Sequence, residues 1–273
     1  MAISLPDTAF AIACYRANHE HESRDPFAHL WVKPGVQKWV DVFKEKVSEY
    51  DEILHCMRNR FFHDTLKEIE DEESDLLCLN LGAGFSMYPY SMTESTVTIE
   101  ADFNDVIEYK QLATDEFVND GSLPNRNVIR MAADITNRAD QVKIQSLLKK
   151  YPNHRKVVMI EGVFFFLNWT QIHDVIEFCA EILSKDDVLL TVSFDTKTAS
   201  TPVFNRLISY FENELHSEGN NTTVPHEFYS NLPEFTLKGT NCSLEMARQF
   251  NLVPYDLQEE SVLNEYCYYL IRK

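Results

Sequence analysis

The segment Leu76–Phe85 holds the residues whose spacing points most clearly to chemistry. A largely apolar run, Leu76–Leu81, ends in Gly82-Ala83-Gly84. The run predicts a buried parallel strand, and the glycines predict a tight turn at which a ligand can approach the backbone. Open α/β sheets bind nucleotide-like cofactors at such turns, where the strands end. The chain has seven glycines in 273 residues, so two glycines one residue apart indicate a specific backbone requirement.

Acidic residues end or follow the predicted strands that come after this turn. Asp102 lies 18 residues beyond Gly84, and an acid at this distance typically accepts hydrogen bonds from ribose hydroxyls. Asp134 and Glu161 stand at the ends of two further predicted strands. Asp134 is placed to accept a hydrogen bond from an adenine amino group, and Glu161 is placed to meet a cationic amino group. Together with the glycine turn, these acids indicate an adenosine-containing ligand without a pyrophosphate.

The glycine turn does not complete a dinucleotide-binding fingerprint. The pattern G-x-G-x-x-G needs a third glycine for close packing of helix on strand, and Met87 stands at that position. Helical sequence also precedes the first strand, so a nicotinamide or flavin enzyme is a less favoured alternative. If the ligand is S-adenosylmethionine, its carboxylate needs a planar cation. The candidates are Arg58, Arg60 and Arg16 in the N-terminal part of the chain.

Charge and cysteine content limit the classes of partner. Asp and Glu number 43 against 25 Lys and Arg, giving a net charge of −18. Nucleic acids and anionic membranes both attract basic surfaces, so we expect the chain to bind neither. None of the six cysteines forms a C-x-x-C pair, which predicts free thiols in a reducing compartment. His19 and His21 flank Glu20 without a further ligand at metal-site spacing, so we expect no metal site. No signal peptide is recognised at the N-terminus, and we expect a cytoplasmic protein.

Strand and helix patterns alternate in the second part of the chain. The predicted strands are Leu76–Leu81, Thr96–Ala101, Asn127–Ala132, Lys156–Glu161, Val188–Phe194 and Tyr266–Ile271. The predicted helices are Asp105–Phe117, Ala139–Lys150, Thr170–Leu183 and Ser243–Phe250. Asn168 and Gln171 form an expected capping pair before the third of these helices. This alternation predicts an α/β fold with a mostly parallel sheet covered on both faces.

Two segments lie outside this alternation. Residues 1–75 have a helical pattern and are predicted to form an N-terminal helical extension or cap, before an α/β domain at residues 76–273. One apolar helical stripe is formed by Val36, Val40, Phe43, Val47, Tyr50 and Leu54. A polar segment at about residues 196–240 is predicted to be a lid inserted over the ligand site. His226 in this segment is the one side chain that we consider as a catalytic base.

Taken in order, these segments resemble the leucine carboxyl methyltransferase-like family. That family groups protein-phosphatase carboxyl methyltransferases, a wybutosine-forming tRNA enzyme and bacterial polyketide O-methyltransferases. The chain ends at its last strand and is acidic, which disfavours a tRNA substrate. The similar blocks are Arg58–Phe62, Leu79–Gly84, Ile99–Phe103, Ala133–Ile135 and Glu161–Leu167.

The resemblance implies a class I methyltransferase fold: a Rossmann-like sheet whose last strand is antiparallel. It also implies S-adenosyl-L-methionine as the methyl donor. By position, Gly82, Ala83 and Gly84 would line the donor, Asp102 would meet the ribose, Asp134 and Ile135 the adenine, Glu161 the methionine amino group, and Arg58 with Arg16 the methionine carboxylate.

One departure from the family lies directly after the glycine turn. Family members usually have an apolar residue followed by Asp-Thr-Arg, whereas this chain has Phe-Ser-Met-Tyr-Pro-Tyr at Phe85–Tyr90. We expect donor binding to survive, because the backbone turn remains. Ser86 is expected to cap a short helix in this segment.

The leading hypothesis is an S-adenosylmethionine-dependent O-methyltransferase that acts on a carboxyl or hydroxyl group of a small molecule in secondary metabolism. Carboxyl methylation of a protein C-terminus is one alternative, and a non-catalytic donor-binding protein is another. A carboxylate acceptor is already ionised at neutral pH, whereas a hydroxyl benefits from a base such as His226. The predicted lid contains Phe204, Tyr210, Phe211, Phe228 and Tyr229. Two interpretations fit these aromatic residues equally: they line an apolar acceptor pocket, or they pack in the core.

Overall fold

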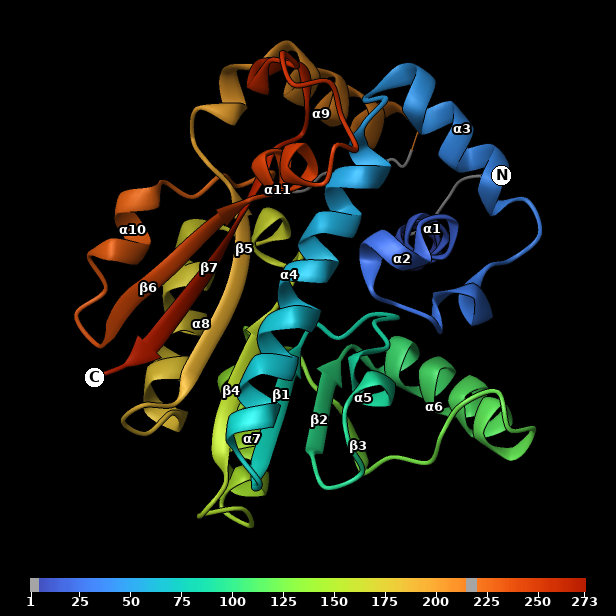
Figure 1. Cartoon of the computed structure of the whole chain (residues 1–273). Helices are drawn as coiled ribbons and strands as arrows, with labels where there is room; N and C mark the ends of the chain where they lie inside the picture. Colours follow the sequence, from blue (N-terminus) through green and yellow to red (C-terminus); the bar gives the residue numbers. More distant parts are fainter. Residues whose placement is uncertain (1–4, 215–219) are drawn as a thin grey trace.

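The computed structural model describes residues 5–214 and 220–273, and these form a seven-stranded sheet with helices on both faces (Figure 1). The strands are β1 Leu76–Leu81, β2 Val97–Asp102, β3 Val128–Ala132, β4 Arg155–Ile160, β5 Val188–Phe194, β6 Phe235–Cys242 and β7 Glu265–Arg272. The α-helices are α1 Leu5–Asn18, α2 Glu20–Ser23, α3 Val36–Lys46, α4 Asp51–Glu72, α5 Tyr88–Ser91, α6 Asn104–Asn119, α7 Arg138–Leu148, α8 Trp169–Ile182, α9 Pro202–Glu214, α10 His226–Ser230 and α11 Ser243–Gln249. Short 3₁₀ turns lie at Ala28–Trp31, Phe164–Phe166, Thr198–Ser200 and Glu259–Ser261.

The sheet is parallel except at one side. The strand order is β3-β2-β1-β4-β5-β7-β6, and β7 runs antiparallel to both β5 and β6. The predicted mostly parallel sheet with an antiparallel last strand is therefore confirmed. From β1 the chain proceeds to β2 on one side and later to β4 on the other. Open α/β sheets bind ligands where the strand order reverses in this way, and here the reversal lies at the carboxyl ends of β1 and β4.

Two apolar layers cover the sheet because successive strand side chains point to opposite faces. Phe62 and Leu66 of α4 pack on one face in a cluster that includes Cys78 of β1. Ile176 of α8 packs on the other face in a cluster that includes Leu79. Figure 1 shows α4 crossing one face of the sheet, while α8 lies behind it. The helix α4 thus carries side chains directly over the ends of the central strands.

The predicted strands and helices after residue 75 are confirmed, the strands to within one residue at each end and the helices to within two. The capping box of Asn168 and Gln171 at the start of α8 is also confirmed. The pattern did not predict β6, whose first residues fall within the segment predicted as a lid. β6 is an edge strand with mostly exposed or half-buried residues, so its sequence has no apolar run. Residues 215–219 of that predicted lid lie outside the described residues.

The prediction of one continuous helical stripe is wrong in one respect. The helical conformation is interrupted after Val47, and the stripe is divided between two helices, α3 and α4. The two halves pack on different neighbours. Phe43 of α3 lies edge-on to Tyr210 of α9 with ring centroids 5.2 Å apart, whereas α4 packs on the sheet. Asp51 and Glu52 are the first residues of α4, where their negative charges interact favourably with the positive end of the helix dipole. No helix in the described ranges is long and apolar enough to span a bilayer.

Candidate functional site

The glycine turn after β1 has the conformation that its sequence predicts. Gly82 and Gly84 have φ values of +75° and +43°, in the left-handed region that glycine adopts without steric cost. An ideal Cβ on Gly82 would lie 2.4 Å from Cγ2 of Val163, whereas one on Gly84 would meet nothing within 4 Å. Packing against the loop after β4 therefore requires the first glycine. The second glycine leaves open space above the backbone, as a bound ligand would need.

Asp102 connects the end of β2 to this turn. Its Oδ2 accepts a hydrogen bond of 2.7 Å from the backbone N–H of Gly84, and its Oδ1 accepts one of 2.7 Å from the N–H of Phe103. Burial raises the pKa of Asp102 above its usual value, although these two N–H groups oppose the shift. Each carboxylate oxygen has a second lone pair that a ribose hydroxyl could use. The geometry therefore fits the predicted ribose contact.

A buried ionic cluster lies beside the turn, where β4 ends and β7 begins. Arg58 of α4 donates from Nε to Oε1 of Glu161 at 2.9 Å. Its Nη1 donates to both carboxylate oxygens of Glu265, at 2.9 and 2.8 Å. The hydroxyl of Tyr88 donates to Oε2 of Glu161 at 2.7 Å. We refer to these four residues as the Arg58 cluster.

Charge keeps Glu161 ionised within the Arg58 cluster. Burial alone would raise the pKa of Glu161, but the positive charges of Arg58 and Arg16 and the hydrogen bonds from Tyr88 and Arg58 hold it below its usual value of 4.5. At neutral pH the site therefore presents a carboxylate that can bind an ammonium group. The predicted pair for the two ends of an amino acid, Arg58 and Glu161, is in direct contact.

The other two N-terminal arginines differ in position. Arg16 is buried, and it donates to Asp25 at 2.9 Å and to the carbonyl of Phe85 at 3.0 Å. It therefore attaches the N-terminal helices to the loop after the glycine turn, and its positive charge helps to lower the pKa of Glu161. Arg60 faces elsewhere and pairs with Asp64 on the same helix at 3.4 Å.

Asp134 and Ile135 follow β3, two strands away from β1 at the same edge of the sheet. Oδ1 of Asp134 accepts hydrogen bonds from the backbone N–H and the hydroxyl of Thr136, at 2.9 and 2.7 Å. These bonds fix the loop after the strand. Ile135 is buried in the apolar layer. Their assignment to adenine stays a prediction.

His226 lies at the start of α10, on the other face of the sheet from the Arg58 cluster. Its Nδ1 is 2.5 Å from the hydroxyl of Tyr268, and its Nε2 is 3.5 Å from Oδ2 of Asp195. Its ring packs edge-on against Tyr266, with centroids 4.3 Å apart. Tyr266 and Tyr268 point to the face opposite Glu265, because strand side chains alternate. Both ring nitrogens therefore have partners, and the role of His226 as a base stays a prediction.

The segment that departs from the family pattern stabilises the glycine turn. Ser86 does not cap α5, whose N-cap is Met87 without a side-chain cap, so that expectation is wrong. Instead the hydroxyl of Ser86 donates to the carbonyl of Ala83 at 2.8 Å and accepts from Asn80 at 2.9 Å. The ring of Trp31 donates from Nε1 to Met87 Sδ at 2.9 Å and stacks on the ring of Phe85, with centroids 4.7 Å apart.

Sequence reasoning missed two residues of the Arg58 cluster, Glu265 and Tyr88. Glu265 is the first residue of β7, and the antiparallel direction of that strand places its start beside the end of β5, at the carboxyl edge of the parallel strands. That direction was a usable signal for Glu265. Tyr88 lies 73 residues from its partner Glu161, and no local pattern indicates the contact.

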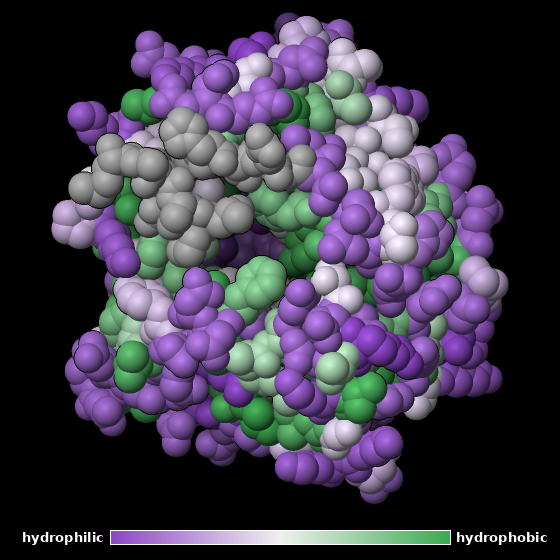
Figure 2. Space-filling view, turned by 180° about the vertical axis from the view of Figure 1, so that it is seen from behind, coloured by the Kyte–Doolittle hydropathy of each residue, from purple (hydrophilic) through white to green (hydrophobic). Residues whose placement is uncertain are grey.

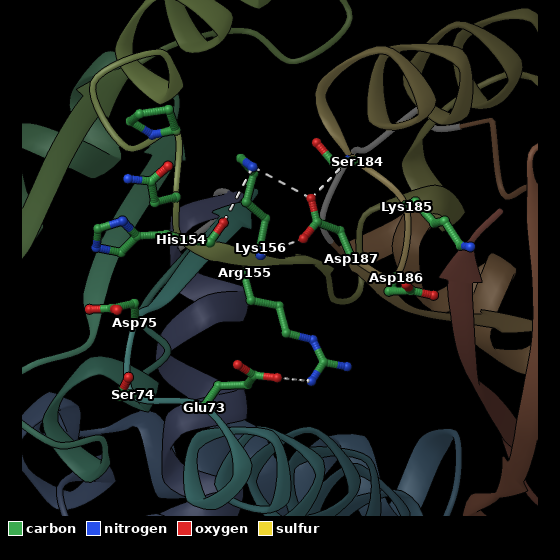
Figure 3. Close-up of a pocket in the computed structure, with 12 residues that line it drawn as sticks. Glu73, Ser74, Asp75, His154, Arg155, Lys156, Ser184, Lys185, Asp186 and Asp187 are labelled. Atoms are coloured by element: carbon green, nitrogen blue, oxygen red, sulfur yellow. Dashed lines mark hydrogen bonds and ion pairs between the residues drawn. The ribbon is translucent and has the colours of Figure 1, made fainter.

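The molecule is hollowed in more than one place. Figure 2 shows a central hollow with a hydrophilic interior (purple) between hydrophobic side chains (green). A separate cavity of about 450 Å³ lies at the opposite edge of the sheet from the glycine turn, where β4 and β5 begin (Figure 3). Two ion pairs line it, Arg155 with Glu73 at 2.8 Å and Lys156 with Asp187 at 3.5 Å. This cavity is not part of the candidate donor site.

Solved structures share this fold. A candidate methyltransferase from Thermobifida fusca YX superposes with a TM-score of 0.68 at 12% identity, covering 100% of this chain and 96% of its own. The magnesium protoporphyrin IX methyltransferase of Synechocystis PCC 6803, solved with bound S-adenosylhomocysteine, has a TM-score of 0.54 at 10% identity, covering 88% of this chain and 94% of its own. At these identities the likeness shows the fold alone.

Sequence comparison gives the family. No curated protein matches the chain by sequence. The sequence profile of the family described as leucine carboxyl methyltransferase matches residues 8–180. The matched residues include the glycine turn, Asp102 and the pair of Arg58 and Glu161, which the structure brings to one edge of the sheet. The chain belongs to the leucine carboxyl methyltransferase family.

Proposed function

We propose that this S-adenosylmethionine-dependent methyltransferase methylates a carboxyl or hydroxyl oxygen of a small molecule in secondary metabolism. Family membership and fold support methyl transfer. The structure of the Synechocystis enzyme with bound S-adenosylmethionine supports the donor. The observation that carries the proposal is the Arg58 cluster beside an open glycine turn. The cluster offers a cation, Arg58, to the carboxylate of the donor's methionine end and an anion, Glu161, to its ammonium group.

The residues present fit the donor. Nη2 of Arg58 has no hydrogen-bond partner among the described residues, so it can receive the methionine carboxylate. Glu161 can receive the ammonium group, and Asp102 the ribose. S-adenosylmethionine supplies a methyl group on a positively charged sulfur. The chain contributes by holding the donor at a fixed place and orientation, because such a displacement depends mainly on alignment of the reacting atoms.

Aromatic side chains support an apolar acceptor. Phe165 follows β4 and Phe194 ends β5, with ring centroids 5.8 Å apart. Phe204 and Phe211 of α9 pack on Phe165 at 6.2 and 5.7 Å. These rings lie at the carboxyl edge of the sheet, where they would exclude water from the reacting atoms. Of the aromatic residues in the predicted lid, Phe204 and Phe211 belong to this group.

The acceptor chemistry decides whether a base is needed. A carboxylate acceptor is ionised at neutral pH and needs only placement. A hydroxyl acceptor would need a base, and His226 would have to exchange one of its present partners to serve. Carboxyl methylation of a protein C-terminus is the second candidate, which the description of the family favours. The six free cysteines support our further proposal of a cytoplasmic location.

A turnover assay tests the proposal. The protein is incubated with S-adenosylmethionine and either aromatic carboxylic acids, hydroxylated aromatics or peptides that end in leucine, and S-adenosylhomocysteine is measured by mass spectrometry. We expect product with a small aromatic acceptor, and none with the Arg58→Ala variant. Product with the peptides alone would favour the second candidate. Donor binding without any turnover would leave a non-catalytic binding protein, and no donor binding would contradict the proposal.

A further inference from the structure

We propose that Glu265 is a positioning residue for donor binding: it fixes Arg58 so that Nη2 faces the carboxylate of the methionine end. This inference rests on the proposed function, since it takes this site as the donor site. Glu265 lies outside the family match at residues 8–180. The register of β7 places it opposite Phe194, the last residue of β5. The C-terminal strand thus completes a site whose other parts come from the first two-thirds of the chain.

The hydrogen bonds of Arg58 leave one nitrogen for a ligand. Both carboxylate oxygens of Glu265 accept from the same nitrogen, Nη1, at 2.9 and 2.8 Å. Nε is used by Glu161 at 2.9 Å. These three hydrogen bonds restrict rotation of the guanidinium group, because its nitrogens lie in one plane. The direction of the remaining nitrogen, Nη2, is therefore set by the two carboxylates.

Gly162 places no side chain next to that nitrogen. An ideal Cβ at this position would lie 3.5 Å from Nη2 of Arg58, and the residue has a φ of +69°. A side chain here would occupy the volume beside the guanidinium group. The absence of one, immediately after Glu161, leaves room for a carboxylate to approach Nη2.

Charge gives the two acids different roles. When an ammonium group binds Glu161, that carboxylate is shared between the ligand and Arg58. Leaving a buried guanidinium with a weakened counter-ion is costly, and Glu265 is the acid that remains bound to Arg58 throughout. Without Glu265, Arg58 would have Glu161 as its sole carboxylate partner among the described residues, and the pair would compete with the ligand. Glu161 is therefore the exchangeable partner of Arg58, and Glu265 the permanent one.

The test compares two ligands that differ only at the methionine end. Isothermal titration measures the Kd of the whole protein for S-adenosylhomocysteine and for 5′-methylthioadenosine, which has no amino or carboxylate group. For Glu265→Gln we expect the Kd for S-adenosylhomocysteine to rise about tenfold to a hundredfold, as for loss of a hydrogen bond to a charged group. The Kd for 5′-methylthioadenosine should stay unchanged. Glu265→Asp keeps the charge but shortens the side chain, and should give a smaller rise.

Glu73→Gln is the matched control. It removes a carboxylate that pairs with Arg155 at 2.8 Å at the far edge of the sheet (Figure 3), and should leave both Kd values unchanged. Wild-type affinity of Glu265→Gln for S-adenosylhomocysteine would overturn the inference. So would an equal loss of both ligands in Glu265→Gln and Glu265→Asp, because that result indicates a general structural role. Failure of the wild-type protein to bind either ligand would instead contradict the proposed function.

Discussion

A methyl group at position 82 tests whether packing requires the first glycine of the turn. In Gly82→Ala the new Cβ would lie 2.4 Å from Cγ2 of Val163, which is at least about 1 Å closer than an ordinary carbon–carbon contact. Overpacking of this kind costs about 1–3 kcal/mol. A left-handed backbone with φ of +75° adds about 1–2 kcal/mol for a residue other than glycine. We therefore expect the free energy of unfolding to fall by about 2–5 kcal/mol.

Urea unfolding followed by tryptophan fluorescence measures this loss. Gly121→Ala is the matched control, because Gly121 has a φ of +82° but nothing within 4 Å of its ideal Cβ. It should lose only the backbone contribution of about 1–2 kcal/mol. In a Val163→Ala background, Gly82→Ala should likewise cost no more than the control. If Gly82→Ala and Gly121→Ala cost the same in the wild-type background, the contact with Val163 does not constrain the turn.

Three further outcomes follow from the described contacts. Asp102→Ala should raise the Kd for S-adenosylhomocysteine at least about tenfold; unchanged affinity in isothermal titration would refute the ribose assignment. Tyr88→Phe removes one hydrogen bond to Glu161 and should raise that Kd about threefold to tenfold, without changing the Kd for 5′-methylthioadenosine; an equal change for both ligands would contradict this role. Burial raises the pKa of Glu70, but Lys67 and the neighbouring threonines together lower it by more, so that the pKa lies below the usual 4.5. The ionised Glu70 therefore stabilises the fold fully above pH 4.5, and this stabilisation is lost as the pH falls through the lowered pKa. Unfolding curves at several pH values should therefore show the difference between wild type and Glu70→Gln shrinking in acid, and a difference that does not vary with pH would be inconsistent with this shift.

Local patterns predicted most of the sheet, because buried parallel strands need apolar runs and the helices between them carry apolar stripes. The edge strand β6 was not predicted, because most of its residues are exposed or half-buried and its sequence therefore has no apolar run. The break between α3 and α4 was not predicted either, because the apolar stripe is continuous in the sequence. The break is visible only in the structure, where the two halves of the stripe pack on different partners. Tertiary packing decided both features.

The candidate site was predictable where chemistry follows a strand end. Asp102 and Glu161 belong to this class, because parallel strands bring their carboxyl ends to one edge. Contacts between distant segments were not predictable in this way. Arg58 and Glu265 are separated by 207 residues, and only the three-dimensional fold shows that the two carboxylates of the Arg58 cluster share one guanidinium group.

A crystal structure of the protein with S-adenosylhomocysteine tests the central claim most directly. We predict that the ligand carboxylate contacts Nη2 of Arg58, that its amino group contacts Glu161, and that its ribose hydroxyls contact Asp102. The backbone of Gly84 should lie against the ligand, because the space above it is open. A ligand bound elsewhere on the molecule, or bound here with its amino acid end directed away from Arg58, would contradict the assignment of this edge of the sheet as the donor site.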